Sequence, residues 1–386
     1  MMLFTKPMQW AACVCCSLYY SIAFRVRWFG TVPRYPGPSL LVANHQHEME
    51  SPAIIATQVV AAWTFRKPFY TVSSRRMWEP GFFAERVPWL RPLLRNVNLG
   101  WLFAATGMQP IENELHSRPF ASVAYTLRKL HGNLDAVAVF KSKALERAPG
   151  IATIADVLVP KHFDLARSYV SLSELNDPYR SEMLAATRAQ LDADIAHFEE
   201  LVRNGATIFL TPEGFYTTDG KMQRFRGILS KLTPLATTYI AAISYDPFVS
   251  ARLSMLYRVK EAANDVSLES DIKRSRPITT SALLGSWLHV NRVEFDVADA
   301  IGAVTSQLWA LPPQAFVDPE LARDPKKMTA RALRSMLRRG MLQKSGDRLA
   351  LGPNLRHPQF TQTADMLAFQ ANFHAETMTG LCAQSL

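Results

Sequence analysis

Cysteine is scarce in this chain, and its few residues are badly placed for a disulfide framework. Cys13, Cys15 and Cys16 are clustered, and Cys382 is the fourth and last. The His and Cys residues do not have the spacing of a metal site either, so no metal ligand set is expected. Since stapled secreted domains carry regular cysteine frameworks, the composition favours a reducing compartment.

Charged residues are also few, and they are unbalanced in sign. They make up 20% of the 386 residues, whereas apolar residues make up 48%, which excludes a disordered chain and supplies a sizeable core in more than one structural unit. The formal net charge is +10 and the pI is about 9.5. This surplus favours an anionic partner, which is nucleic acid, an acidic membrane surface or a phosphorylated substrate.

The uncharged run near the N-terminus is slightly too short for an ordinary membrane span. It covers 18 residues, from Pro7 to Phe24, whereas hydrocarbon is crossed by roughly 20. A tilted, half-inserted or interfacial helix is as compatible with this length as a span, and a helix buried in the protein is the alternative. Arg25 and Arg27 follow directly and favour a cytoplasmic location for the rest. We expect residues 1–24 to form a hydrophobic, membrane-associated helix.

A first segment with the composition of a reaction site follows the strand-like run Ser39 to Ala43. His45 would lie at the carboxyl end of that strand, with Glu50 five residues later. Ser51 is expected to be the N-cap of the next helix, with Pro52 at its first position. A carboxylate is favoured at a helix N-terminus. From there Glu50 could accept a hydrogen bond from one ring nitrogen of His45 and leave the other nitrogen as a base. A histidine that merely satisfies loop hydrogen bonds is the alternative.

A second segment repeats this arrangement of a strand that ends in a polar turn. Residues Ala206 to Leu210 predict a short buried strand. The strand runs into Thr211-Pro212-Glu213-Gly214, and Asp219-Gly220-Lys221 follows. A turn carboxylate such as Glu213 can also do no more than satisfy local amides.

Together the two segments resemble the glycerolipid acyltransferases typified by bacterial 1-acyl-glycerol-3-phosphate acyltransferase. That family carries Asn-His, four residues, then Asp, and far downstream Phe-Pro-Glu-Gly-Thr-Arg-Ser. Asn44-His45 with Glu50, and Thr211 to Gly214 with Phe225-Arg226-Gly227, match in order and type. The resemblance covers about residues 25–250.

The resemblance implies transfer of a fatty acyl group from acyl-CoA or acyl carrier protein to the hydroxyl of a lysophospholipid or glycerol phosphate. His45 would be the general base, and Glu50 would orient it. Glu213 would position the acceptor or anchor its loop, and backbone amides near Gly214 would stabilise the oxyanion. No metal or bound cofactor is implied, because the acyl thioester is a co-substrate.

Three positions depart from the family pattern. Glu50 replaces Asp, Asn113 stands where the family has Arg, and Phe215-Tyr216 replace Thr-Arg. Two phosphate-binding arginines are therefore missing, so either other cations bind the anion or the acceptor is not a simple lysophosphatidate. The candidate replacements are Arg118, Lys221, Arg224 and Arg226. A non-catalytic lipid-binding protein on the same fold is the competing hypothesis.

We expect an α/β, three-layer fold in which a mixed sheet is flanked by helices. The expected divisions are the helix of residues 1–24, an acyltransferase domain over 25–250 with an inserted helical region at about 114–200, and a mainly helical extension over 251–386. An aromatic-rich region, 78–101, is expected to enter the lipid interface, to line an acyl tunnel or simply to pack. The expected partners are membrane lipid, an acyl thioester, an anionic membrane surface and, as an alternative donor, acyl carrier protein.

The C-terminal extension carries one feature of a different class. Ala330 to Met341 predicts a basic helix, and Leu342 to Leu351 predicts a hairpin. This combination resembles part of a winged helix, which makes nucleic-acid binding a competing hypothesis. Because no preceding helix-turn-helix pattern is recognisable, a solvated basic face or membrane contact explains the helix equally well, and no nucleic acid is expected as a partner.

Overall fold

The computed structural model describes residues 2–30, 35, 37–47, 50–62, 69–79, 81–95, 97–112 and 114–382. The chain forms two compact units. Unit 1 consists of Met1–Thr71 and Leu201–Leu386, and unit 2 consists of Val72–Glu200. Unit 1 therefore contains both motif segments and the C-terminal extension. Asn113 lies outside the described residues.

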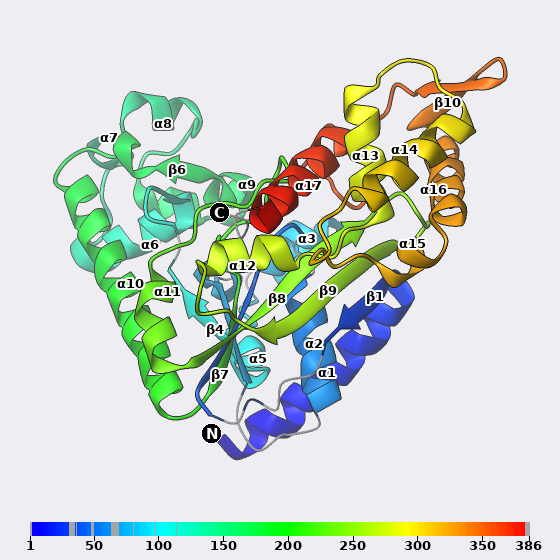
Figure 1. The fold of residues 1–386 in the computed structure, drawn as a ribbon. Coiled ribbons are helices and arrows are strands. Elements are labelled where there is room, and N and C mark those ends of the chain that lie inside the picture. The colour runs from blue at the N-terminus through cyan, green and yellow to red at the C-terminus, as the bar shows by residue number, and fades with distance from the viewer. Residues whose placement is uncertain are drawn as a thin grey trace. The chain divides into compact units, whose positions relative to one another are not determined.

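The expected α/β class with a mixed sheet is confirmed. A seven-stranded sheet has the order β1-β9-β8-β2-β7-β3-β4 (Figure 1). Its strands are β1 Phe24–Phe29, β2 Ser39–Ala43, β3 Phe69–Ser74, β4 Met108–Ile111, β7 Thr207–Leu210, β8 Thr237–Asp246 and β9 Leu253–Glu261. Strand β2 pairs in parallel with both β7 and β8, while β8 and β9 pair antiparallel.

The burial of β2 and β7 explains how the two motif segments come together. Every residue of both strands is buried, as is typical of parallel strands covered on both faces. Because β2 and β7 are parallel neighbours, their carboxyl ends lie at the same edge of the sheet. The residues that follow Ala43 and Leu210 are therefore delivered to one place.

Helices of unit 1 pack against this sheet, and those that follow β9 in the chain form the C-terminal extension. They are α1 Met2–Ala23, α2 Glu50–Ala62, α11 Ile228–Leu232, α12 Leu268–Ser275, α13 Thr280–Val290, α14 Val297–Trp309, α15 Pro319–Arg323, α16 Pro325–Arg338 and α17 Met366–Cys382. The predicted hairpin is confirmed as β10 Leu342–Ser345 paired antiparallel with β11 Arg348–Leu351. The predicted basic helix lies in α16, which begins earlier than expected and ends at Arg338.

The N-terminal helix is present, but the structure corrects one reading of it. In the described part of the chain, no helix combines the length and the apolar character needed to cross a bilayer. Helix α1 packs against α2 and buries Cys13 and Tyr20 in the core. Its other face exposes apolar side chains, namely Met8, Trp10, Leu18, Tyr19 and Ile22.

Unit 2 has its own hydrophobic core. Region 114–200 is mainly helical, as expected, and also contains a two-stranded antiparallel sheet. Its elements are β5 Ser117–Pro119, α6 Phe120–His131, α7 Ala136–Val139, α8 Ser142–Glu146, α9 Phe163–Arg167, β6 Tyr169–Ser171 and α10 Tyr179–Arg203. The preceding aromatic-rich region contains α3 Phe82–Arg86, the 3-10 turn Pro88–Leu90, α4 Arg91–Leu94 and α5 Gly100–Ala105. Its side chains Trp89, Leu93 and Trp101 are between 67% and 79% exposed.

Candidate active site

His45 and Glu50 form the side-chain pair that their spacing predicts. Nδ1 of His45 lies 3.0 Å from Oε2 of Glu50. The Glu50 side chain is fully buried, while the imidazole is 13% exposed. In the part of the chain that the structure describes, Nε2 of His45 makes no hydrogen bond. One ring nitrogen is therefore fixed by a carboxylate, and the other is left for a reacting group.

Glu50 also builds the loop in which His45 sits. It is the first residue of α2, so Ser51 lies inside the helix and is not its N-cap. Its Oε1 accepts hydrogen bonds from the amides of Gln46 at 2.7 Å and His47 at 2.9 Å. Burial and then the charge of Glu50 raise the pKa of Tyr245 well above its usual value. One carboxylate thus orients the imidazole and closes the turn between β2 and α2.

Glu213 joins the second motif loop to the first. Its Oε1 accepts a hydrogen bond from the His45 amide at 2.6 Å, and its Oε2 accepts one from the Gln223 amide at 2.7 Å. The amide of Thr217 donates to the His45 carbonyl at 3.0 Å. Burial raises the pKa of Glu213 to about 7, although both amide bonds and the charge of Arg276 oppose the shift. This is the geometry of a loop anchor.

Gly214 is required by its backbone and by a close neighbour. Its φ is +78°, and a Cβ at this position would meet Nε of Arg226 at 2.3 Å. Arg226 stacks over the ring of Phe215, with 5.0 Å between the guanidinium carbon and the ring centroid. Tyr216 stands edge-on against the imidazole of His45 with ring centroids 5.7 Å apart. Arg226 thus shapes the turn that carries the two aromatic residues.

Two amide side chains beside His45 hold β2 to β8, and sequence reasoning gave neither a role. Oδ1 of Asn44 accepts from the Ile243 amide at 2.7 Å, and its Nδ2 donates to the Ile243 carbonyl at 3.1 Å. Gln46 donates to the same carbonyl at 3.0 Å. The one sequence feature that could have indicated this role is the position of Asn44 directly between a buried strand and His45.

The C-terminal extension reaches the first motif loop. Gln362 donates to the carbonyl of Gln46 at 2.9 Å, and Nε2 of His47 lies 2.6 Å from the carbonyl of Gln359. The His47 ring packs against the rings of Phe24, Tyr245 and Phe360. His47 is therefore a core residue beside the site and not a second base.

A buried ion pair from the same extension supports the second loop. Glu376 of α17 accepts from the Met222 amide at 2.8 Å and pairs with Arg276 at 3.2 Å. Arg276 is 1% exposed and lies over the ring of Phe373 at 4.2 Å. Burial lowers the pKa of Arg276, while the charges of Glu376 and Glu213 raise it. No sequence pattern near Arg276 indicated this role, because its partners are distant in the chain.

The remaining predicted cations are in different situations. Lys221 and Arg224 are exposed in the second loop, and among the described residues neither forms an ion pair. Arg118 belongs to unit 2, where it pairs with Glu112 at 2.9 Å and donates to Thr187. Lys221 and Arg224 therefore keep their charge available, whereas that of Arg118 is already matched.

Neither of two hollows in unit 1 is lined by His45, Glu50 or Glu213. The groove for an acyl chain therefore stays a prediction. Within the described residues, His, Cys, Asp and Glu side chains form no group that could hold a metal ion. The chemistry supported by the geometry is proton transfer by an oriented imidazole. Comparison of the chain with protein-family models and with curated proteins finds no match.

Proposed function

We propose that the chain is an O-acyltransferase of phospholipid biosynthesis, which moves a fatty acyl group from acyl-CoA or acyl carrier protein to a lysophospholipid or glycerol phosphate. The single observation that carries the proposal is the pair in which Nδ1 of His45 lies 3.0 Å from buried Glu50. The motif residues Asn44 and Glu213 support it, because both fix the backbone on either side of the imidazole.

His45 acts as the general base in this proposal. Its Nε2 takes the proton of the acceptor hydroxyl as the oxygen attacks the thioester carbonyl. The tetrahedral intermediate collapses, the C–S bond breaks, and the thiolate takes the proton back from the imidazolium. An alcohol of pKa about 15 is a poor nucleophile at neutral pH, so a positioned base contributes about 100-fold to 10,000-fold. Glu50 stabilises the transient imidazolium.

The second motif loop supplies the groups for the developing charges. The Gly214 amide already donates to the carbonyl of Thr211. Among the described residues, the amides of Phe215 and Tyr216 make no hydrogen bond and are the donors we assign to the oxyanion. Exposed Lys221 and Arg224 are the cations we assign to an anionic head group.

A three-layer acyltransferase-like arrangement and attachment to the cytoplasmic face of a membrane belong to the same proposal. The exposed apolar face of α1, with Trp10, Leu18, Tyr19 and Ile22, supports interfacial binding of unit 1. In unit 2, Trp89 and Trp101 are exposed in a manner typical of residues at a lipid interface.

A lipid-binding protein without catalysis is the second candidate, and one contact favours it. Tyr216 stands where the family has Arg, and its ring is nearly perpendicular to the His45 imidazole, at 87°. An aromatic ring in this place offers apolar contact to a lipid instead of a charge to its phosphate.

Thiol release from palmitoyl-CoA in mixed micelles containing lysophosphatidate or glycerol 3-phosphate separates the two candidates. We expect acceptor-dependent release from the wild type and a loss of about 100-fold or more in His45→Ala. His47→Ala is the control that tests whether the neighbouring imidazole matters. Equal background rates for the wild type and His45→Ala, together with lipid binding, would establish the binding protein instead.

A further inference from the structure

The C-terminal extension contains a complete helix and strand arrangement that is separate from the proposed active site. Helix α13 is followed by Phe295, which forms an antiparallel bridge to Leu349 of β11. Helices α14, α15 and α16 come next, and then the β10–β11 hairpin. The chain thus adds a third, one-residue strand beside β11, so that β11 lies between Phe295 and β10.

Three of these helices pack on one another and on the hairpin. Helix α14 contacts both α13 and α16, α13 contacts α16, and α16 contacts β10. Their shared core contains Phe295, Ala300, Val304, Leu333, Met336 and Leu349, each at most 6% exposed. With the short helix α15 set aside, the order helix, strand, helix, helix and hairpin is that of a winged helix, in which the last helix enters a DNA groove.

The last helix of this arrangement and the hairpin after it together carry most of the basic surplus of the chain. Residues 325–351 contain eight Lys and Arg and one acidic residue, which accounts for seven of the formal net charge of +10. Four of the cations recur at intervals of four, three and four residues, which places them on one face of α16. They are Lys327, Arg331, Arg334 and Arg338.

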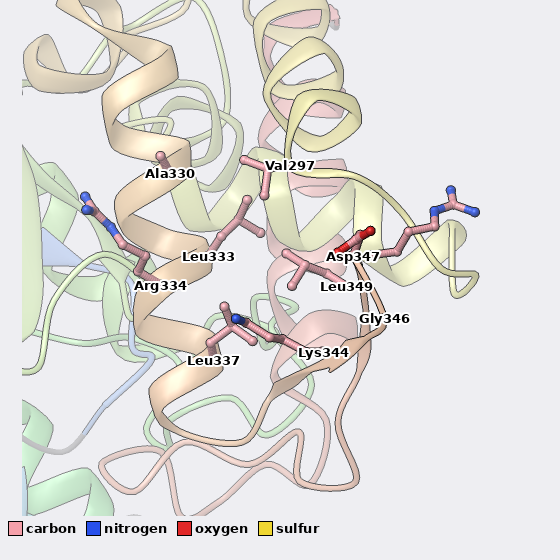
Figure 2. A pocket seen from close by; sticks show the side chains of 10 residues that line it. Val297, Ala330, Leu333, Arg334, Leu337, Lys344, Gly346, Asp347 and Leu349 are labelled. Carbon is pink, nitrogen blue, oxygen red and sulfur yellow. The ribbon is translucent and has the colours of Figure 1, made fainter.

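Hollows border this face of α16 on both sides. One, of about 440 Å³, lies between α16, Val297 of α14 and the hairpin (Figure 2). Its lining is mainly apolar and also includes Arg334, Lys344, Arg348 and the acidic Asp347. The other, of about 360 Å³, is lined by Arg331 together with Arg25, Arg252 and Ser250. The basic face is therefore a ridge with a hollow along each flank, and the lining of each hollow includes basic side chains.

We propose that this surface binds duplex DNA, with α16 in the major groove. The B-form major groove is about 12 Å wide and admits a helix, whose flanks then face a phosphate backbone on each side. The two hollows lie where those backbones would run, and each contains two or more basic side chains. A-form RNA does not fit this arrangement, because its major groove is deep and narrow.

Only some of the basic side chains on and beside the ridge have hydrogen-bond or ion-pair partners within the described part of the protein. Arg339 donates to the carbonyls of Pro247 and Ser250 and is structural. Arg348 lies 3.8 Å from Asp296, and both side chains are about half exposed. Arg334 and Lys344 are exposed and form no ion pair within the described ranges. A flat anionic bilayer would meet the ridge but leave both hollows empty, which favours a grooved partner.

The test is binding of the full chain to a fluorescent duplex of mixed sequence, followed by anisotropy over a salt series. We expect affinity to fall between about 50 and 200 mM salt, with a slope of about −0.9 per phosphate contact. Arg334→Ala with Lys344→Ala should weaken binding at least about tenfold and reduce the slope by about 2. Acyl transfer should be unchanged, since neither residue lies in the proposed active site.

The matched control is Arg128→Ala with Lys129→Ala, which removes the same charge from exposed positions of α6 in unit 2. It should bind DNA like the wild type. The proposal is overturned if the wild type does not bind the duplex at low salt, or if the control variant weakens binding as much as the α16 variant. It is also overturned if the α16 variant loses binding to vesicles of anionic phospholipid while its DNA affinity stays that of the wild type.

Discussion

Replacing Glu50 by Gln tests the proposed site most directly, because it changes one atom and keeps the side-chain shape. The Gln oxygen would still be held by the amides of Gln46 and His47, which now bind Oε1 at 2.7 and 2.9 Å. The NH2 group must then face Nδ1 of His45 and donate to it. That fixes the proton of the neutral ring on Nε2, which is the wrong tautomer for a base.

The expected loss can be worked from the distance between the two groups. With an effective dielectric constant of about 20, a carboxylate and an imidazolium separated by 3.0 Å attract by about 5.5 kcal/mol. At about 1.4 kcal/mol per factor of ten, the full attraction would correspond to nearly 10,000-fold in rate. The neutral ring already gains part of it, so we expect kcat to fall by about 100-fold to 10,000-fold with KM little changed.

The assay is initial thiol release at saturating acceptor, with Glu50→Asp as the matched variant. Asp keeps the charge and is the acid of the family that the motifs resemble, so it should retain more activity than Gln. Circular dichroism checks that both variants fold. Full activity of Glu50→Gln alongside an inactive His45→Ala would refute the orienting role of Glu50, whereas full activity of both would refute the proposed base.

Three further predictions concern the loops around the site, and denaturant unfolding measures each of them. Gly214→Ala should lower the free energy of unfolding by about 1 to 3 kcal/mol, because the φ of Gly214 is +78° and an added Cβ would clash with Arg226. Gly227→Ala should be neutral or stabilising, because the φ of Gly227 is −61° and no atom lies within 4 Å of an added Cβ. Equal losses in the two variants would contradict the strain argument. Burial raises the pKa of Glu213 from 4.5 to about 7 in the folded state, so its contribution to stability is fully present below pH 4.5 and is lost as the pH rises to about 7. The free energy of unfolding should therefore fall by about 3 kcal/mol over this range in the wild type but not in Glu213→Gln. Parallel pH curves for the two proteins would refute this. Asn44→Ala removes both hydrogen bonds to the main chain of β8 and should cost about 2 kcal/mol, since the buried Ile243 amide loses its acceptor while the Ile243 carbonyl keeps Gln46 as a donor. A loss under about 0.5 kcal/mol would count against this role.

Local pattern was enough to find the strands and the pair that follows them. Ser39–Ala43 and Thr207–Leu210 are short, mainly apolar runs that end in polar turn residues, and this combination is typical of buried parallel strands. The contact between His45 and Glu50 could be predicted for the same reason. Both residues belong to one tight turn between a strand and a helix, so the chain itself limits their separation.

Partners distant in the chain could not be predicted in this way. Glu213 could be read as a substrate ligand or as an anchor, and only its bonds to the amides of His45 and Gln223 show it holding the loops. Arg276 and Glu376 form an ion pair although they are 100 residues apart in the chain, and no local sequence pattern predicts such a contact. The prediction that Ser51 is the N-cap of α2 is also wrong, because the helix begins one residue earlier, at Glu50.

The sequence by itself determined the α/β class, the basic surplus and the pairing of His45 with Glu50, since each depends on composition or on residues close together in the chain. Tertiary structure alone decided that the C-terminal extension supports both loops and that one bridge, Phe295 to Leu349, joins the hairpin to the segment between α13 and α14. The physical reason is that burial and charge neutralisation are set by neighbours in space, and the fold chooses those neighbours from anywhere in the chain.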